Sequence, residues 1–247
     1  MNVLIIGLGS IAKKHINALL SLSKDFKIFA LRSSLDAEKF ENVINIFDLD
    51  DESLTFNFAI ISNPTHLHYH YIKLLSKKEI PLFIEKPAVH SLDKVDDLLL
   101  LVSQKKLITY VACNLRFHPC LLFLRKKLTY DKLRINEVNV YCGSYLPDWR
   151  PGKDFRKIYS ANSAMGGGVH LDLFHELDYV TWLFGFPNSS HSIIRNVSSL
   201  AIDAADYANY ILQYEAFTLS VVLNYYRRKP KREIEIVFEN ITLTVNL

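Results

Sequence analysis

The sequence predicts an α/β protein whose first half forms a doubly wound parallel sheet and whose second half is an α+β region with a mostly antiparallel sheet. Up to about residue 117, short apolar runs alternate with amphipathic segments of helical length, which is typical of parallel strands joined by helices. A buried strand, a glycine loop and a helix open the chain. From His191 onward, strand-like runs follow one another closely, as they do in an antiparallel sheet.

The composition is that of a soluble globular protein and excludes several classes of partner. The chain has 247 residues, of which 49% are hydrophobic and 22% charged. Its 29 basic and 26 acidic residues give a net charge of +3, which is too small to indicate a nucleic-acid or membrane partner. No apolar run approaches the roughly 18 residues that span a bilayer. The N-terminus lacks the features of a signal peptide, and the three cysteines do not have the spacing of a metal site. We therefore expect a cytoplasmic protein with reduced thiols.

The N-terminal glycine loop predicts a dinucleotide site. A strand over Val3 to Ile6 runs into Gly7-x-Gly9-x-x-Ala12, and a helix follows to about Leu22. In this context Gly7 permits the tight turn, Gly9 lets a pyrophosphate approach the backbone, and Ala12 lets the helix pack closely on the strand. The phosphates would bind the first amides of the helix, at Ser10 and Ile11, where the helix dipole favours negative charge. The alternative is a tight turn that binds nothing.

The next strand, Phe26 to Leu31, indicates which dinucleotide binds. NAD-specific domains usually place Asp or Glu after this strand, where it accepts hydrogen bonds from the ribose 2′-hydroxyl. Here the chain reads Arg32-Ser33-Ser34, and Arg32 can pair with a 2′-phosphate while the serines donate to it. The sequence therefore favours NADP over NAD, although an arginine can also stack on the adenine.

Three histidines after the strand Phe56 to Ser62 do not predict a metal site. This strand ends in Asn63-Pro64-Thr65, and we expect Thr65 to cap a helix that runs to about Lys77. Of His66, His68 and His70, only the first and last share a helical face, and zinc needs at least three ligands. We expect one of these histidines to face the cofactor.

The run Leu82-Phe83-Ile84-Glu85-Lys86-Pro87 predicts a buried strand that ends in a functional group. The proline stops the strand and holds Lys86 in an extended conformation at its carboxyl end. Ligands of open α/β sheets bind at the carboxyl ends of the strands, so the ammonium of Lys86 is placed to meet a substrate. A surface lysine that happens to end a strand is the alternative. A helix over Ser91 to Gln104 and a strand over Leu107 to Cys113 complete the first sheet.

The second half begins with a helix (Cys120 to Leu128), a β-rich stretch (Arg134 to Gly143) and a loop to Arg156. The side chains of this loop suit a hydroxyl-rich or phosphorylated ligand, and the alternative is a loop held by its own ion pairs. We also expect one continuous helix from the glycines at 166–168 to about Phe184. Five strands should follow, at Ser192 to Leu200, Tyr207 to Tyr214, Phe217 to Tyr226, Arg232 to Phe238 and Ile241 to Val245. The basic run from Arg227 to Arg232 is expected at a hairpin tip.

Four motifs in order resemble those of the Gfo/Idh/MocA family of sugar and cyclitol oxidoreductases. They are Gly7-x-Gly9-x-x-Ala12 with His15, Asn63-Pro64-Thr65-x-x-His68, Glu85-Lys86-Pro87, and Asn114-x-Arg116-x-x-Pro119. The resemblance implies a Rossmann domain over residues 1–117 and a substrate and dimerisation domain over 118–247. It also implies that Lys86 acts at the reacting carbon and that Pro87 is a candidate cis-proline.

A second signature of the family maps onto the segment after the glycines. The resemblance implies that Asp172 and His175 flank the substrate. Their spacing is three residues where four is common in the family, so it stays open whether Asp172, His175 or His170 carries the proton. Members of the family also usually continue beyond the point at which this chain stops, at Leu247.

These inferences give three sets of candidate residues and no metal ligand. The catalytic set is Lys86, Asp172 and His175. The cofactor set is Gly7, Gly9, Ser10, Ile11, Ala12, Arg32, Ser33, Asn63, Pro64, Thr65, His68, Glu85, Lys86 and Asn114. The substrate set is Arg116, Trp149, Arg150, Asp154, Arg156 and His170.

Together the motifs predict an NAD(P)-dependent oxidoreductase that moves a hydride between nicotinamide and a hydroxyl or carbonyl of a sugar or nucleotide sugar. The sequence of the 144–156 loop resembles that of family members from surface polysaccharide or glycan synthesis. We expect a homo-oligomer formed through the C-terminal sheet. A dinucleotide- or sugar-binding sensor or subunit without catalysis is the alternative, and the short C-terminus favours it.

Overall fold

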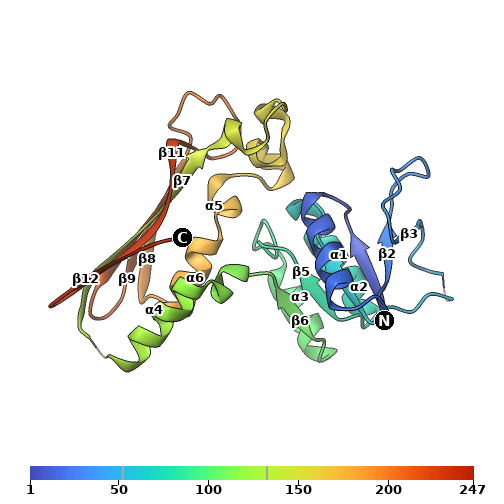
Figure 1. Ribbon diagram of the computed structural model, residues 1–247, viewed down its shortest axis with the longest axis horizontal. Coiled ribbons are helices and arrows are strands. Elements are labelled where there is room, and N and C mark those ends of the chain that lie inside the picture. The colour runs from blue at the N-terminus through green and yellow to red at the C-terminus, as the bar shows by residue number, and fades with distance from the viewer. Residues whose placement is uncertain (52, 132) are drawn as a thin grey trace. The chain divides into compact units, whose positions relative to one another are not determined.

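The computed structural model describes residues 1–51, 53–131 and 133–247. The chain divides into two compact units, Met1–Ala112 and Cys113–Leu247 (Figure 1). This division falls at the end of the first sheet, a few residues before the boundary expected from the sequence. The first unit is α/β, and the second combines helices with a mostly antiparallel sheet. The predicted fold class is therefore confirmed.

The first unit contains a six-stranded parallel sheet in the order β3-β2-β1-β4-β5-β6. Its strands are β1 (Asn2–Ile6), β2 (Lys27–Leu31), β3 (Val43–Ile46), β4 (Phe58–Ile61), β5 (Leu82–Ile84) and β6 (Thr109–Val111). From β1 the chain adds strands first on one side and then, with β4, on the other. Ligands of such sheets bind outside the carboxyl ends of the strands at this point of reversal.

Helices cover both faces of the parallel sheet because the strand residues are apolar on both faces. On one face Val3 and Ile5 pack against α1 (Ser10–Leu22). On the other face Leu4 and Ile6 belong to the cluster formed with α2 (His68–Lys77) and α3 (Val95–Gln104). Thr65 was expected to cap α2, but the residue at the cap position is Leu67, because the 3₁₀ turn η1 (Thr65–Leu67) precedes the helix.

The second unit contains a six-stranded sheet in the order β12-β11-β7-β10-β9-β8. Its strands are β7 (Ile135–Tyr145), β8 (Ser189–Arg195), β9 (Tyr207–Gln213), β10 (Thr218–Asn224), β11 (Tyr226–Phe238) and β12 (Thr242–Asn246). The pair β7 and β10 is parallel, and the other pairs are antiparallel. Three helices pack on one face, namely α4 (Pro119–Tyr130), α5 (Val169–Asp172) and α6 (His175–Phe184) (Figure 1).

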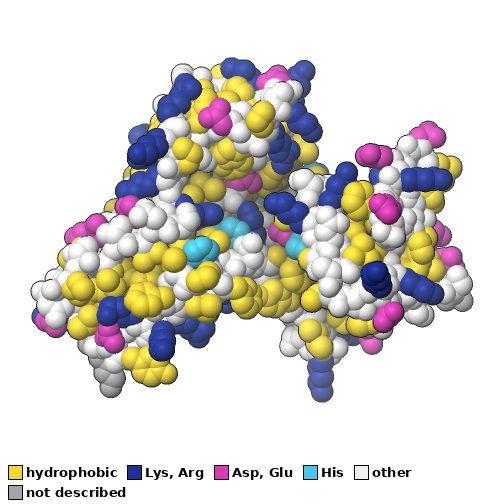
Figure 2. All heavy atoms as spheres, in the orientation of Figure 1, with side chains coloured by type: hydrophobic (Ala, Val, Ile, Leu, Met, Phe, Trp, Pro, Cys, Tyr) yellow, Lys and Arg dark blue, Asp and Glu magenta, His cyan; other side chains and the backbone are white. Residues whose placement is uncertain are grey.

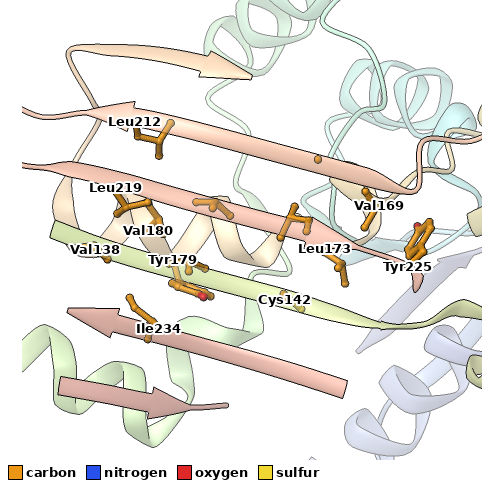
Figure 3. Packing of buried hydrophobic residues seen from close by; sticks show 14 of the residues in the cluster. Val138, Cys142, Val169, Leu173, Tyr179, Val180, Leu212, Leu219, Tyr225 and Ile234 are labelled. Atoms are coloured by element: carbon orange, nitrogen blue, oxygen red, sulfur yellow. The ribbon is translucent and has the colours of Figure 1, made fainter. Parts of the chain in front are cut away.

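The core of the second unit lies between this sheet and α6. Alternate strand residues point to the helices, among them Val138, Leu219 and Ile234, while Tyr179 and Val180 of α6 point back to the strands (Figure 3). All of these side chains are at most 1% exposed. The alternation leaves the opposite face of the sheet with partly exposed side chains, and none of the described helices covers it (Figure 1).

The continuous helix expected from residues 169 to 184 is wrong, because the chain breaks it after Asp172. Leu173 leaves the helical conformation, with a φ of −96° and a ψ of 33°, and α6 starts afresh at His175. Asp172 and His175 therefore belong to two different helices.

A buried ion pair fixes α6 on the sheet. Glu176 is 0% exposed, and Arg232 of β11 donates to it from Nε (2.6 Å) and Nη2 (3.2 Å). Removing one partner of such a pair would leave an uncompensated buried charge, which costs about 3–5 kcal/mol. Burial, and then the charge of Glu176, raises the pKa of Cys142 to about 12, so this thiol stays protonated. No disulfide joins any of the described cysteines.

Two further expectations for the second sheet are wrong. The basic run is not a hairpin tip but the first part of β11, where Lys231 pairs with Gly143 after a shift in register. Arg227 and Arg228 lie over the rings of Tyr141 and Tyr145, so aromatic faces hold these cations along the strand.

The strand expected over 192–200 instead spans 189–195. Its end is set by Asp206, which accepts hydrogen bonds from the backbone amides of Val197 and Ser198 and turns the chain there. Within the described part of the chain, none of the helices is both long and apolar enough to cross a membrane.

Candidate active site

The glycine loop between β1 and α1 leaves room for a ligand at the start of the helix. Gly7 has a φ of +86°, and a Cβ there would lie 2.5 Å from the Cα of Asn63, so only glycine fits. At Gly9, by contrast, a Cβ would meet no heavy atom within 4 Å among the described residues. Ala12 is fully buried against the sheet. Gly7 thus serves packing, whereas Gly9 leaves the first amides of α1, at Ser10 and Ile11, open to a ligand.

The carboxyl end of β4 closes the other side of this loop. The hydroxyl of Ser62 donates to the carbonyl oxygens of Ile6 (3.2 Å) and Gly7 (2.9 Å). The side-chain amide of Asn63 is buried, and neither of its polar atoms has a hydrogen-bond partner among the described residues. Buried amides are nearly always hydrogen-bonded. An amide of this kind beside an open helix start therefore fits a ligand with polar atoms, as a dinucleotide has.

At the end of β2, Arg32 lies beside the neighbouring strand. Its Nη1 is 3.2 Å from the carbonyl oxygen of Glu38 and 3.5 Å from Oδ1 of Asn45. The side chain is half-buried, and Ser33 next to it is exposed. A guanidinium and a hydroxyl therefore stand together after the second strand.

The carboxyl end of β5 is tied to α1 through Glu85. Oε1 of Glu85 lies 2.6 Å from Nε2 of His15, and its Oε2 accepts from the backbone amide of Lys86 at 3.2 Å. The ring of His15 also meets the ring of Phe83 edge to face, with centroids 5.2 Å apart. The glycine-loop helix and the residue before Lys86 are thus joined within one unit.

His68 holds the segment that follows Lys86. The Lys86–Pro87 peptide bond is cis, as the resemblance implied. Nδ1 of His68 lies 3.1 Å from the carbonyl oxygen of Pro87, and its Nε2 lies 2.9 Å from that of Asn63. The imidazole therefore joins the ends of β4 and β5, and Lys86 sits half-buried beside this connection.

His68 is almost completely buried. The residue is 1% exposed, and burial lowers the pKa of its imidazole, while the carbonyl of Asn63 and then those of Pro87 and Ala88 act in the opposite direction. Of its neighbours, His66 is half-buried and His70 is exposed. We therefore propose that His68, placed in the cofactor set by its motif, acts by holding Asn63 and Pro87.

In the second unit, Arg116 pairs with a buried carboxylate. Its Nε and Nη2 donate to the two oxygens of Asp178 at 3.0 and 2.5 Å, and Asp178 is 6% exposed. Two donors of the guanidinium therefore hold α6 rather than pointing to solvent. Asn114, at the start of the 3₁₀ turn η2 (Asn114–Phe117), is exposed.

Helix α5 carries the acidic candidate and one of the two histidines. Oδ2 of Asp172 accepts a hydrogen bond of 2.5 Å from the hydroxyl of Tyr225. His170 is half-buried, and burial lowers its pKa, with the charge of Asp172 acting in the opposite direction. Nδ1 of His170 is buried without a hydrogen-bond partner among the described residues. His175 opens α6, and two residues separate it from the end of α5. The second unit thus places a carboxylate and two imidazoles at the junction of two short helices.

The loop after β7 is partly anchored and partly exposed. Nε1 of Trp149 donates to Ser144 at 2.8 Å, and its ring meets Tyr225 edge to face. Asp154 caps the 3₁₀ turn η4 (Phe155–Lys157) by accepting from the amide of Arg156. Arg150, Asp154 and Arg156 are exposed. Trp149 is therefore a packing residue as well as a candidate contact, whereas the charged residues are accessible.

Sequence reasoning missed three residues that organise the site, namely Ser62, Asp178 and Tyr225. Each acts through a contact between distant parts of the chain, up to 62 residues apart for Asp178 and Arg116. For Ser62 a signal existed, because it directly precedes the Asn-Pro-Thr motif. For Asp178 and Tyr225 nothing in the local sequence indicates the partner.

The two family models that match the chain cover most of it. A model described as an oxidoreductase family with an NAD-binding Rossmann fold matches residues 1–113, and a model of the GFO/IDH/MocA C-terminal domain matches residues 131–244. The chain belongs to the Gfo/Idh/MocA family. Its first unit is thus the NAD-binding domain of an oxidoreductase family, as the motifs indicated.

Individual relatives agree with this assignment. The chain is 26% identical over 231 residues to the inositol 2-dehydrogenase of Rhizobium meliloti (strain 1021), which covers 89% of this chain and 67% of that protein. The WlbA dehydrogenase from Bordetella pertussis, solved in complex with NADH and UDP-GlcNAcA, has the same fold. It has a TM-score of 0.84 at 16% identity, over 100% of this chain and 77% of that one. Myo-inositol 2-dehydrogenase from Lactobacillus plantarum gives a TM-score of 0.82 at 17% identity, over 99% and 76%.

The lowered pKa of His68 predicts that the protein loses stability in mild acid. The unfolded chain takes up a proton at this residue near pH 6.5, whereas the folded chain resists it to lower pH. The free energy of unfolding should therefore fall as the pH drops from about 7.5 to about 5.5. His68→Gln should reduce this dependence, and His170, whose pKa is also lowered, should account for part of the remainder. Urea denaturation at several pH values measures the slope.

The matched control is His70→Gln, because His70 is exposed on the same helix. It should leave the pH dependence unchanged. Equal slopes for the wild type and His68→Gln would contradict the account of His68 as a buried imidazole with a lowered pKa.

Proposed function

We propose that this protein is an NAD(P)-dependent oxidoreductase that transfers a hydride between nicotinamide and a CH–OH carbon of a sugar, cyclitol or nucleotide sugar. The observation that carries the proposal is the arrangement at the carboxyl edge of the parallel sheet. There, the open start of α1 and the buried amide of Asn63 adjoin the β5 end that bears Lys86. A phosphate-binding helix start and an ammonium at neighbouring strand ends suit a dinucleotide and the group that reacts with it.

The residues of the chain would divide the chemistry as follows. A bound nicotinamide supplies or accepts the hydride. Lys86 would hydrogen-bond the reacting oxygen and stabilise its developing negative charge. Oxidation of a carbinol also requires a base for the hydroxyl proton. His175 would fill this role, because imidazole gains and loses protons near neutral pH, and Asp172 would orient the reacting group.

The cofactor preference that we propose is NADP. The support is Arg32, whose guanidinium stands at the end of β2 beside exposed Ser33, where a 2′-phosphate would be placed. A carboxylate, which would accept from the 2′-hydroxyl of NAD, is not at this position.

The substrate class that we propose is a sugar or nucleotide sugar used in surface polysaccharide or glycan synthesis. The support is the charged part of the loop after β7. Arg150 and Arg156 in this loop are exposed and can bind a phosphate. The solved WlbA complex contains a nucleotide sugar, and the relative from Rhizobium meliloti is an inositol dehydrogenase. We also propose a cytoplasmic site of action, which suits cysteines that form no disulfide among the described residues.

Titration calorimetry with NADPH and NADH tests the cofactor proposal. Arg32→Ala should weaken NADPH about tenfold or more, because a hydrogen bond to a charged group contributes about 1.5–3 kcal/mol, and should leave NADH nearly unchanged. Gly9→Ala should weaken both, because its Cβ would enter the space left for the pyrophosphate. The same substitution makes no contact with the described chain, so the fold should survive. Equal loss of both dinucleotides in Arg32→Ala would contradict a 2′-phosphate contact.

Lys86→Ala should abolish most of the turnover. Removal of one donor to a developing oxyanion typically lowers kcat about 100-fold or more. The assay follows reduction of NADP and NAD with myo-inositol, sugars and UDP-sugars. Lys77→Ala is the matched control, because Lys77 is an exposed lysine in the same unit. Unchanged turnover in Lys86→Ala would overturn the mechanism. If the wild type binds a dinucleotide but turns over none of these compounds, the result would favour the non-catalytic sensor or subunit.

We also propose that two copies associate through the uncovered face of the second sheet. This face carries Glu137 and Glu235 toward one end and Arg227 and Lys231 toward the other. In Figure 2, Lys and Arg side chains gather at the upper end of this unit, where Figure 1 labels β7 and β11. A two-fold arrangement would set the acidic end of one copy against the basic end of the other.

Sedimentation velocity checks this association. The wild type should sediment as twice the 28.5 kDa monomer. Glu235→Lys should shift the protein toward monomer, whereas Glu41→Lys, an exposed change in the first unit, should not. A monomeric wild type at micromolar concentration would contradict the proposed interface.

A further inference from the structure

Tyr225 lies where the second sheet turns around the end of β7. The strands β10 and β11 flank β7 on either side, and Tyr225 is the one residue between them. Its carbonyl accepts from the amide of Leu146, directly after β7, and its own amide donates to the carbonyl of Asp206. The backbone of Tyr225 is therefore fixed by two segments that are distant in the sequence.

The side chain of Tyr225 is fixed as firmly as its backbone. The residue is 0% exposed, and its ring meets that of Trp149 edge to face, with centroids 5.3 Å apart and an interplanar angle of 87°. Its hydroxyl is a hydrogen-bond donor, and a carboxylate oxygen accepts. The hydroxyl donates to Oδ2 of Asp172, at 2.5 Å.

Asp172, in contrast, stands on an element that does little to fix it. Helix α5 has four residues, and Asp172 is its last. The helix begins after Gly168, whose φ is +131°, and ends where Leu173 leaves the helical conformation. Isolated helices of this length are not stable by themselves. Contacts outside α5 therefore help to hold the Asp172 carboxylate, and the hydroxyl of Tyr225 supplies one.

We propose that Tyr225 is a positioning residue for the reaction, whose buried hydroxyl holds Oδ2 of Asp172 so that the other carboxylate oxygen is oriented toward the substrate. This inference rests on the proposed function, because it takes Asp172 to work at the substrate. Tyr225 itself is 0% exposed and would act through Asp172. Burial, and then the charge of Asp172, raises the pKa of Tyr225 well above its ordinary value, so the phenol remains a donor. It is thus not the base of the reaction.

Tyr225→Phe removes the hydroxyl and keeps the ring, so the packing against Trp149 is retained. Tyr179→Phe is a matched control, because Tyr179 is also 0% exposed and in the same core, but its hydroxyl has no hydrogen-bond partner among the described residues. Figure 3 shows Tyr225 at one end of the core cluster and Tyr179 near its middle, on α6. A general effect of losing a buried phenol should appear in both variants, and an effect on Asp172 in Tyr225→Phe alone.

The experiment is a double-mutant cycle on the full chain with Tyr225→Phe, Asp172→Asn and the combination. Oxidation of myo-inositol, or of whichever sugar or UDP-sugar the wild type turns over, gives kcat and KM. Tyr225→Phe should lower kcat about tenfold or more while the Kd for the dinucleotide stays the same, because misplacement of a reacting group by about 1 Å can cost 100-fold. Tyr179→Phe should match the wild type. The combined variant should be no slower than Asp172→Asn, since the hydroxyl acts through Asp172.

Wild-type kcat in Tyr225→Phe, or losses that multiply in the combined variant, would overturn the inference. The same four proteins are compared by urea denaturation, which needs no substrate. If the wild type turns over none of the compounds, the proposed function fails, and the stability cycle still decides about Tyr225. Losses in unfolding free energy that simply add would overturn the anchoring contact, and losses smaller in combination than in sum would support it.

Discussion

The carboxyl end of β5 depends on a set of hydrogen bonds to its backbone and to Glu85. His15 of α1 binds Glu85, and the ring nitrogens of His68 of α2 lie 3.1 and 2.9 Å from the carbonyl oxygens of Pro87 and Asn63. These contacts join the glycine loop, the end of β4 and the end of β5 into one rigid edge. Lys86 occupies a half-buried position at that edge. A group that acts on a substrate needs such support, because small displacements of reacting groups have large effects on rate.

In the second unit, buried ion pairs hold the helix that begins at His175. Arg232 holds Glu176, and Arg116 holds Asp178, so α6 is fixed at two positions by carboxylates that are at most 6% exposed. Each of these pairs would be costly to break, because one charge would remain buried without its partner. Tyr225 adds a hydrogen bond from a neutral hydroxyl, to Asp172 of α5. Short helices that could not be stable alone are thereby held in place against the sheet.

The local sequence predicted the elements whose contacts are local, and the resemblance predicted the sites. The apolar runs of β1 and β5, the glycine loop and the free space at Gly9 all follow from patterns within a few residues. The cis bond at Pro87 followed from the motif around it. The same reasoning was wrong where distant residues decide the conformation. The break after Asp172 belongs to a region held by Tyr225 and Arg232, which are 53 and 56 residues away from their partners. The basic run of β11 was mistaken for a turn because aromatic partners on β7 are invisible in its own sequence.

The most direct measurement is a crystal structure of the full chain with NADPH bound. The account predicts that the pyrophosphate lies on the amides of Gly9, Ser10 and Ile11, that the amide of Asn63 hydrogen-bonds the dinucleotide, and that Nζ of Lys86 stands beside the reactive carbon of the nicotinamide. A dinucleotide bound with its nicotinamide directed away from Lys86 would contradict the account, because the group at the end of β5 would then have no part in the reaction.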